Sequence, residues 1–177
     1  MVISQSPGDA AVADGLRAGI TNMLRHCAAL RPGQSLLILS EPAGARHYDP
    51  GLAPAVAVVA GDLGLRVTLR ELPHCPAASP PPPEVMAAIA RADRALFLTR
   101  RGDQLRFDPV LAPAAPVICY ALDRGMMASG FGRADHRGLL ALLGCLNAAL
   151  AGAGEIHVTC PLGTDFRGPG ARFPDSG

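Results

Sequence analysis

Short apolar runs along the chain alternate with longer stretches in which apolar residues recur at helical spacing. A run such as Ser35 to Ser40, apolar inside and bounded by turn residues, is typical of a strand buried on both faces. The pattern predicts strands at residues 35–40, 65–72, 94–99, 116–122 and 154–160, and helices at 11–30, 49–63, 83–92 and 135–151.

Apolar strands that alternate with helices predict a parallel sheet with helices on both of its faces. The predicted fold class is therefore α/β, a Rossmann-like three-layer sandwich with a mostly parallel sheet of about five strands. We expect a flexible arm at residues 1–10, a single domain at 11–160, and a C-terminal tail at 161–177 that is exchanged between the subunits of a dimer.

The amino-acid composition excludes several classes of structure and function. Of the 177 residues 49% are hydrophobic, which excludes disorder over most of the chain. All 16 cationic residues are arginine, so Schiff-base chemistry and a P-loop lysine are excluded, and the net charge of +1 does not predict nucleic-acid binding. No apolar stretch reaches the ~20 residues that span a bilayer, and the N-terminal residues do not resemble a secretory signal. We expect no nucleic-acid or membrane partner.

The five cysteines are scattered, and four of them lie inside apolar patterns. This spacing indicates reduced, buried thiols in a cytoplasmic protein rather than a disulfide framework. The four are Cys27, Cys119, Cys145 and Cys160.

Catalytic and cofactor motifs are absent from the strand ends, where open parallel sheets bind their ligands. The turn after the first strand has no G-x-G-x-x-G, and neither a Walker A motif nor G-x-S-x-G occurs. His26-Cys27 and His74-Cys75 are adjacent pairs whose side chains point in different directions. We therefore predict no catalytic residue, no metal and no cofactor. Asp135 before His136 is interpreted as a helix cap in preference to a catalytic pair.

Arginines near the strand ends and two methionines in a glycine-containing loop are the best binding candidates. Arginine binds carboxylates through a planar fork, and methionine adapts to irregular partners. The alternatives are a solvated surface for the arginines and a plug into the core for the methionines. The predicted peptide-binding residues are Arg100, Arg101, Arg124, Met126, Met127 and Arg133.

Several longer motifs resemble a known enzyme family. They are Leu30-Arg31-Pro32-Gly33-Gln34-Ser35-Leu36-Leu37-Ile38, Asp123-Arg124-Gly125-Met126-Met127-Ala128-Ser129-Gly130, Ala134-Asp135 before a helix, and Glu155-Ile156-His157-Val158-Thr159-Cys160-Pro161-Leu162-Gly163-Thr164-Asp165. They are similar to the N-terminal domain of the aminopeptidase T-like metallopeptidases and of the related 2,5-dihydroxypyridine 5,6-dioxygenases. The resemblance covers about residues 15–166.

The resemblance implies the fold of that family without its chemistry. The family's metal ligands lie in a second domain after the Gly-Thr-Asp motif, and no residue of this sequence matches them. No catalytic residue is therefore carried over, and we expect a truncated homologue. Shortened relatives of this kind resemble the small peptide-binding proteins of ribosomal-peptide (crocagin-type) biosynthetic clusters.

Three functions remain open. The first is a non-catalytic protein that binds a precursor peptide, or acts as a scaffold for its modifying enzymes, and that forms a homodimer. The second is a metal-less subunit of an aminopeptidase- or dioxygenase-like enzyme that a partner chain completes. The third is a small-molecule-binding domain. We favour the first, because an outer strand offers free main-chain groups to an extended peptide.

Overall fold

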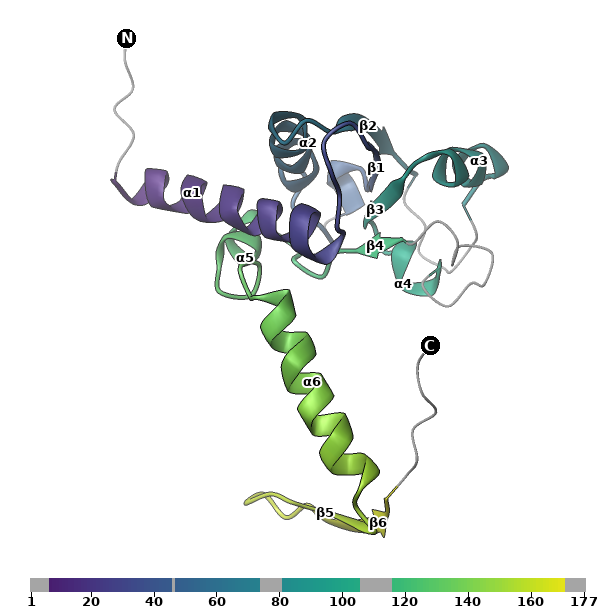
Figure 1. Ribbon diagram of the computed structural model, residues 1–177. Coiled ribbons are helices and arrows are strands. Elements are labelled where there is room, and N and C mark those ends of the chain that lie inside the picture. The colour runs from purple at the N-terminus through teal and green to yellow at the C-terminus, as the bar shows by residue number, and fades with distance from the viewer. Residues whose placement is uncertain (1–6, 46, 74–80, 106–115, 171–177) are drawn as a thin grey trace. The chain divides into compact units, whose positions relative to one another are not determined.

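The computed structural model describes residues 7–45, 47–73, 81–105 and 116–170. The chain forms two compact units, unit 1 (Met1–Ala134) and unit 2 (Asp135–Gly177), labelled by element in Figure 1. Unit 1 contains α1 (Pro7–Asn22), η1 (Met23–Cys27), β1 (Ser35–Ser40), η2 (Ala43–Ala45), α2 (Leu52–Asp62), β2 (Arg66–Glu71), α3 (Pro83–Arg91), β3 (Arg94–Leu98), α4 (Gly102–Leu105), β4 (Val117–Ile118) and α5 (Arg124–Ala128). Unit 2 contains α6 (His136–Ala151), β5 (Glu155–Thr159) and β6 (Asp165–Pro169).

A four-stranded parallel sheet forms the centre of unit 1, in the order β2-β1-β3-β4. β1 is paired on both sides, with Leu37 opposite Thr68 of β2 and Ala95 of β3. β4 contributes only two residues at one edge, and β2 forms the other edge. This arrangement confirms the predicted Rossmann-like α/β fold class, with four strands in this sheet.

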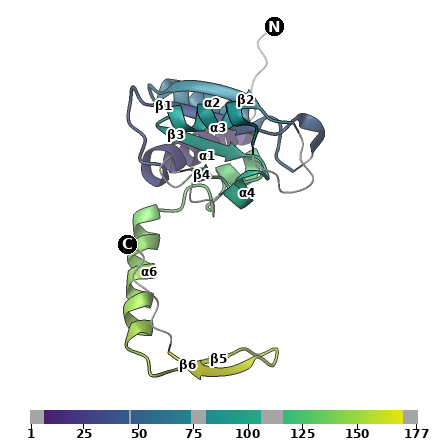
Figure 2. The ribbon, with the colours of Figure 1, turned by 90° about the vertical axis from the view of Figure 1, so that its right-hand side faces the viewer.

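Helices cover both faces of the sheet (Figure 2). Leu36 and Ile38 of β1 pack with residues of α1, η1 and α2 on one face. Leu37 and Leu39 pack with α3 on the other face, together with the fully buried Phe97 of β3. Because alternate residues of a strand point to opposite faces, only a strand that is apolar at every position can fill both layers.

The first helix begins and ends earlier than predicted. α1 starts at Pro7, so residues 7–10 of the predicted flexible arm are helical, and residues 1–6 lie outside the described part of the chain. The π-helical turn η1 follows α1, and Ala29 then takes a φ of 53° in the left-handed region. The helix therefore ends before Leu30.

Unit 2 consists of one helix followed by a two-stranded hairpin. β5 pairs antiparallel with β6, with His157 opposite Arg167, so the segment predicted as a fifth parallel strand pairs instead with part of the predicted tail. No side chain of α6 is buried within this unit. No helix of the described residues has the length and apolarity needed to cross a membrane. The single domain predicted at 11–160 includes parts of both units and stays a prediction.

The prediction of buried cysteines was wrong for three of the four. Cys119 is buried beside β4, whereas Cys27, Cys145 and Cys160 are exposed. Cys27 ends η1, Cys145 lies on the uncovered α6, and Cys160 follows β5. An apolar sequence context therefore did not identify which side of each element is covered.

Candidate functional site

A small cavity of about 160 Å³ lies at the carboxyl ends of the parallel strands. Ligands of open α/β sheets bind at this edge. Three of the lining side chains are carboxylates, and none is an arginine. The lining residues are Ser40, Glu41, Ala43, Tyr48, Asp49, Pro50, Ala53, Pro54, Leu69, Glu71 and Leu98.

Glu41 joins the end of β1 to the end of β3. Its Oε1 accepts a hydrogen bond of 2.5 Å from the main-chain N–H of Arg100. Its Oε2 is buried and makes no hydrogen bond among the described residues. Glu41 thus fixes the turn after β3 and contributes negative charge to the cavity.

Tyr48, in the loop before α2, lines the cavity. Its hydroxyl donates a 2.7 Å hydrogen bond to the main-chain carbonyl of Cys119. Burial, followed by the negative charges of neighbouring groups such as Cys119, Asp103 and Glu41, raises the pKa of Tyr48 far above its usual value. The tyrosine therefore stays neutral and serves as an anchor rather than as an acid or base.

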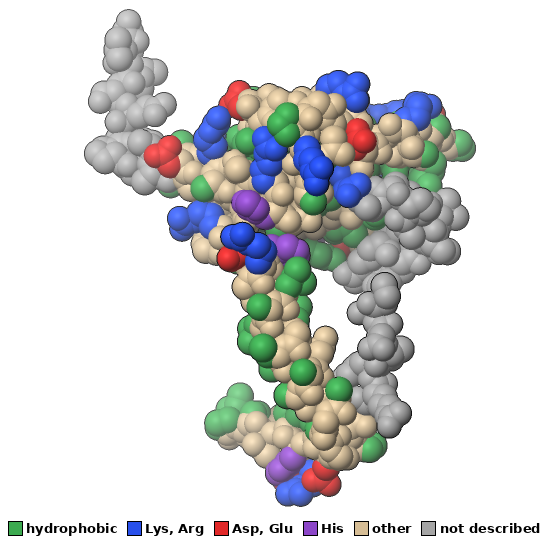
Figure 3. Space-filling model, in the orientation of Figure 1, with side chains coloured by type: hydrophobic (Ala, Val, Ile, Leu, Met, Phe, Trp, Pro, Cys, Tyr) green, Lys and Arg blue, Asp and Glu red, His purple; other side chains and the backbone are tan. Residues whose placement is uncertain are grey.

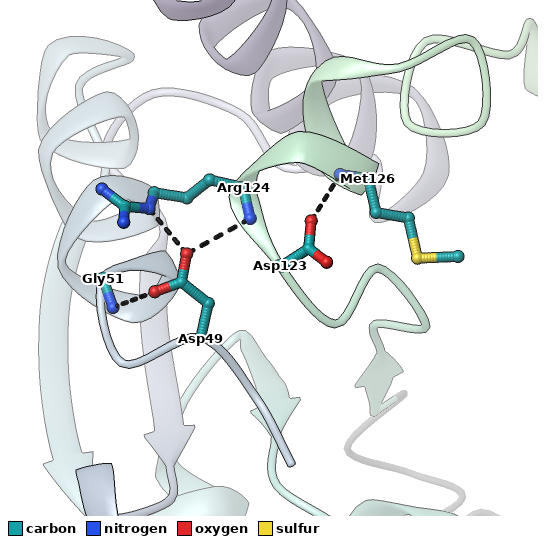
Figure 4. A network of polar contacts seen from close by, with 5 residues as sticks. All are labelled: Asp49, Gly51, Asp123, Arg124 and Met126. Carbon is teal, nitrogen blue, oxygen red and sulfur yellow. Dashed lines mark hydrogen bonds and ion pairs between the residues drawn. The ribbon is translucent and has the colours of Figure 1, made fainter. Parts of the chain in front are cut away.

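Asp49 connects the loop before α2 to the start of α5 (Figure 4). Its Oδ2 accepts a 2.6 Å hydrogen bond from Nε of Arg124, and its Oδ1 accepts one of 2.8 Å from the N–H of Gly51. Burial favours the neutral carboxyl, but the hydrogen bonds from Arg124 and Gly51 outweigh this effect and lower the pKa of Asp49. The guanidinium lies against Gly51, where a Cβ would be 2.9 Å from its central carbon.

The glycine-containing segment that holds the two candidate methionines begins with the short helix α5. Asp123 caps it, with Oδ1 accepting a 2.7 Å hydrogen bond from the N–H of Met126. α5 packs closely on α1, because Gly19 has no side chain and a Cβ there would overlap the Met127 carbonyl oxygen. A local carboxylate cap and a glycine on the facing helix thus fix this segment.

The six predicted peptide-binding residues are distributed over three places, and none lines the cavity. Arg100 is exposed and Arg101 half-buried just after β3, where Arg101 Nη2 lies 3.4 Å from the Pro73 carbonyl oxygen. On α5, Arg124 is engaged by Asp49, Met126 is exposed and Met127 is buried. Arg133 lines an open hollow beside α1. Their role in binding stays a prediction.

The cap at the start of α6 is as predicted. Asp135 Oδ1 accepts a 3.0 Å hydrogen bond from the N–H of Arg137, which is the behaviour of an N-cap and not of a catalytic partner for His136. His157 is exposed in the hairpin and lies 2.6 Å from Asp165. The described residues contain no group of three or more His, Cys, Asp or Glu side chains placed to hold a metal. His74 and Cys75 lie outside the described residues.

Sequence reasoning did not select Tyr48, Asp49 or Glu71 as site residues. Asp49 is the first residue of the helix predicted at 49–63, and its carboxylate accepts the N–H two residues on, in the local turn that aspartate favours. Ser40 and Glu41 could be identified from their position after the first strand. No local sequence signal identifies Glu71 as a site residue, because its position at the cavity depends on the pairing of β2 with β1.

Comparison with known proteins shows the fold. No family model matches the sequence, and no curated protein matches it. Among solved structures, the chain is similar to 2,5-dihydroxypyridine dioxygenase from Pseudomonas putida KT2440, with a TM-score of 0.58 and 16% identity. The match covers 94% of this chain and therefore includes residues of both units, but only 48% of the dioxygenase chain. This chain is thus a distant structural relative that spans about half of that protein's length.

Proposed function

We propose that the protein is a non-catalytic peptide-binding protein, which holds an extended segment of a ribosomally made precursor peptide in the cytoplasm while other enzymes modify it. The observation that carries the proposal is the outer edge of the parallel sheet at β2. An extended peptide can add to such an edge by main-chain hydrogen bonds.

β2 is the end strand of the sheet, and within the described residues it pairs only with β1. The N–H groups of Arg66 and Leu72 donate to the carbonyls of Gln34 and Ser40, at 2.8 and 2.9 Å. Peptide groups of alternate residues point to opposite sides of a strand. Those of Val67, Leu69 and Glu71 therefore point away from β1, toward the edge.

The cavity lies beside this edge and is small. Leu69 and Glu71 of β2 are among its lining residues. Its volume of about 160 Å³ is below the roughly 300–1,000 Å³ of typical small-molecule sites, and suits a single side chain. This size favours a peptide ligand over an independent small-molecule ligand.

The structural similarity to a dioxygenase supports a second candidate function, that of an enzyme subunit. A subunit of a dioxygenase- or aminopeptidase-like enzyme would need a partner chain to supply the metal ligands. Co-purification with the products of adjacent genes, followed by elemental analysis, distinguishes the two functions. One equivalent of bound iron or zinc in such a complex would favour the enzyme subunit.

We further propose a homodimer in which unit 2 is covered by a second copy. Eight large apolar side chains of this unit are exposed, and Figure 3 shows hydrophobic groups along α6. At on the order of 100 Å² each, they approach the roughly 800 Å² that each partner buries in a standard interface. They are Leu139, Leu140, Leu142, Leu143, Leu146, Val158, Leu162 and Phe166.

Sedimentation velocity tests the dimer. Leu139 and Leu143 lie on one side of α6, at the spacing of neighbours on a helix. The double variant Leu139→Glu with Leu143→Glu is expected to sediment as a monomer. Ala141→Glu with Ala148→Glu adds the same charge to the opposite side and should remain a dimer. A monomeric parent protein contradicts the homodimer.

Isothermal titration with synthetic peptides that cover any short peptide encoded in the same gene cluster tests peptide binding. Saturable binding is expected for at least one peptide. Leu69→Pro should weaken that binding at least tenfold, or about 1.4 kcal/mol, because proline removes an N–H that faces the edge and not β1.

The matched variant is Thr68→Pro, which removes an N–H that faces β1. It should destabilise unit 1 more than Leu69→Pro does. N-methylation of the peptide residues whose N–H groups point toward β2 should abolish binding. N-methylation of the alternate residues, whose N–H groups point away from β2, should leave binding unchanged. Absence of saturable binding for every peptide, or full affinity in Leu69→Pro, would contradict the proposal.

A further inference from the structure

The side chains of β2 divide into a basic face and an apolar face. Side chains alternate along a strand, so Arg66, Thr68 and Arg70 share one face of the sheet. Arg70 lies on the α3 side, where its Nη2 is 3.7 Å from Glu84 Oε1. Val67 packs against the core cluster on the other face, and Leu69 beside it is 45% exposed. The side chains of a strand added to this edge would lie alternately beside the basic face and beside the apolar face.

The charge of the basic face is only weakly compensated. Arg70 and Glu84 are 38% and 63% exposed, and exposed pairs of this kind are weak. Asp93 lies near Arg66, but its Oδ2 already accepts hydrogen bonds from the N–H and hydroxyl of Ser35, at 2.7 and 2.6 Å. Glu71 lies on the apolar face and lines the cavity. Both arginines therefore remain available to a ligand carboxylate.

From this arrangement we infer that the peptide held at β2 carries acidic residues four positions apart, with apolar residues between them. The inference rests on the proposed function. A ligand strand that hydrogen-bonds to Val67, Leu69 and Glu71 places every second side chain over the basic face. Carboxylates at positions i and i+4 then lie opposite Arg66 and Arg70, about 13 Å apart at roughly 3.3 Å per residue. Positions i+1 and i+3 lie on the face of Val67 and Leu69.

Two fluorescein-labelled, end-blocked peptides test the inference. One contains Glu-Val-Thr-Val-Glu and the other Lys-Val-Thr-Val-Lys, each between two Ser-Gly pairs. Cross-strand charge pairs contribute modestly, so the acidic peptide should bind about tenfold more tightly by fluorescence anisotropy at 50 mM salt. A peptide of the acidic composition in the order Glu-Glu-Thr-Val-Val should lose most of this preference.

Charge-reversal variants of the protein, tested with the same two peptides, provide the decisive experiment. Arg66→Glu with Arg70→Glu should reverse the preference toward the basic peptide, and Arg66→Gln with Arg70→Gln should abolish it without adding negative charge beside Asp93. The matched control is Arg137→Glu with Arg167→Glu, which changes two exposed arginines of unit 2. It has the same net charge as the reversal variant and should keep the acidic preference. Circular dichroism confirms that each variant is folded.

The outcomes separate this inference from the proposed function. Equal binding of the acidic and basic peptides, with both lost in Leu69→Pro, overturns the ligand chemistry and leaves edge addition intact. A loss of preference in Arg100→Glu with Arg133→Glu, while Arg66→Gln with Arg70→Gln keeps it, also overturns the inference and supports the sequence-predicted binding arginines instead. If neither peptide binds while a precursor peptide does, the inference is wrong and the peptide-binding function stands. If no peptide of either kind binds, both are wrong.

Discussion

Leu36 to Leu39 in β1 of unit 1 are at most 4% exposed, whereas Leu139, Leu140, Leu142 and Leu143 in α6 of unit 2 are each about half exposed. The two segments have similar apolar composition. In unit 1, strands pair on both sides of β1 and helices cover both faces of the sheet. In unit 2, a helix and a hairpin bury no residue of α6. Apolar sequence therefore indicates that a surface must be covered, but not what covers it.

The largest effect on stability is expected from a comparison of one phenylalanine in each unit. Phe97→Ala should lower the free energy of unfolding of unit 1 by about 3–5 kcal/mol, because Phe97 is fully buried. Phe166→Ala should change the same transition by less than about 0.5 kcal/mol, because Phe166 is 59% exposed in unit 2.

Both tyrosines, Tyr48 and Tyr120, lie in unit 1 and there is no tryptophan, so tyrosine fluorescence in urea reports on this unit. Equal shifts of the midpoint in the two phenylalanine variants would show that the two units do not differ in the way described above.

An intermediate effect is expected from the polar link between the α2 loop and α5. Asp49→Asn should destabilise unit 1 by about 1–3 kcal/mol at pH 7, since it removes a charged hydrogen-bond partner of Arg124. The pKa of Asp49 is lowered in the folded state, so its contribution is present above the unfolded value of about 4 and is lost as the pH falls through the folded value.

Urea unfolding between pH 7 and pH 2 should therefore show a shallower acid loss in Asp49→Asn than in the parent. Asp62→Asn, which removes an exposed ion pair with Arg17, serves as the control and should change stability by less than about 0.5 kcal/mol. Identical acid profiles in Asp49→Asn and the parent would exclude a role for this carboxylate in stability.

The smallest perturbation is alkylation of the cysteines. Burial raises the pKa of the Cys119 thiol in unit 1 to about 11. Hydrogen bonds with the side chain and main chain of Thr164 lower the pKa of the exposed Cys160 thiol in unit 2. Among the four cysteines that the structure describes, iodoacetamide at pH 7.5 should therefore modify Cys160 first and Cys119 last, as followed by peptide mass spectrometry.

Thr164→Val should slow alkylation of Cys160 and leave Cys119 unchanged. If Cys119 reacted as fast as Cys160, the thiol of unit 1 would be accessible and the burial contrast between the units would be wrong.

Local patterns predicted most elements of unit 1 and the cap of α6 in unit 2. The apolar run at 35–40 forms β1 with the predicted bounds, and Asp135 caps α6 as predicted. The binding candidates were less predictable. The six residues were chosen because they are arginines or methionines near the strand ends. Met127 is buried against α1, however, and Arg124 is hydrogen-bonded to Asp49, 75 positions earlier in the sequence. Long-range packing of this kind leaves no periodic signal.

The amino-acid sequence by itself determined the α/β class, because a strand buried on both faces must be apolar at every position and a helix must repeat its apolar residues with its own period. The tertiary structure alone decided that β2 is an edge, that Glu41, Asp49 and Glu71 line one cavity, and that β5 pairs with β6. The physical reason is that pairing partners and cavity walls come from residues distant in the chain. Their meeting depends on strand order, which local hydrophobic patterns do not encode.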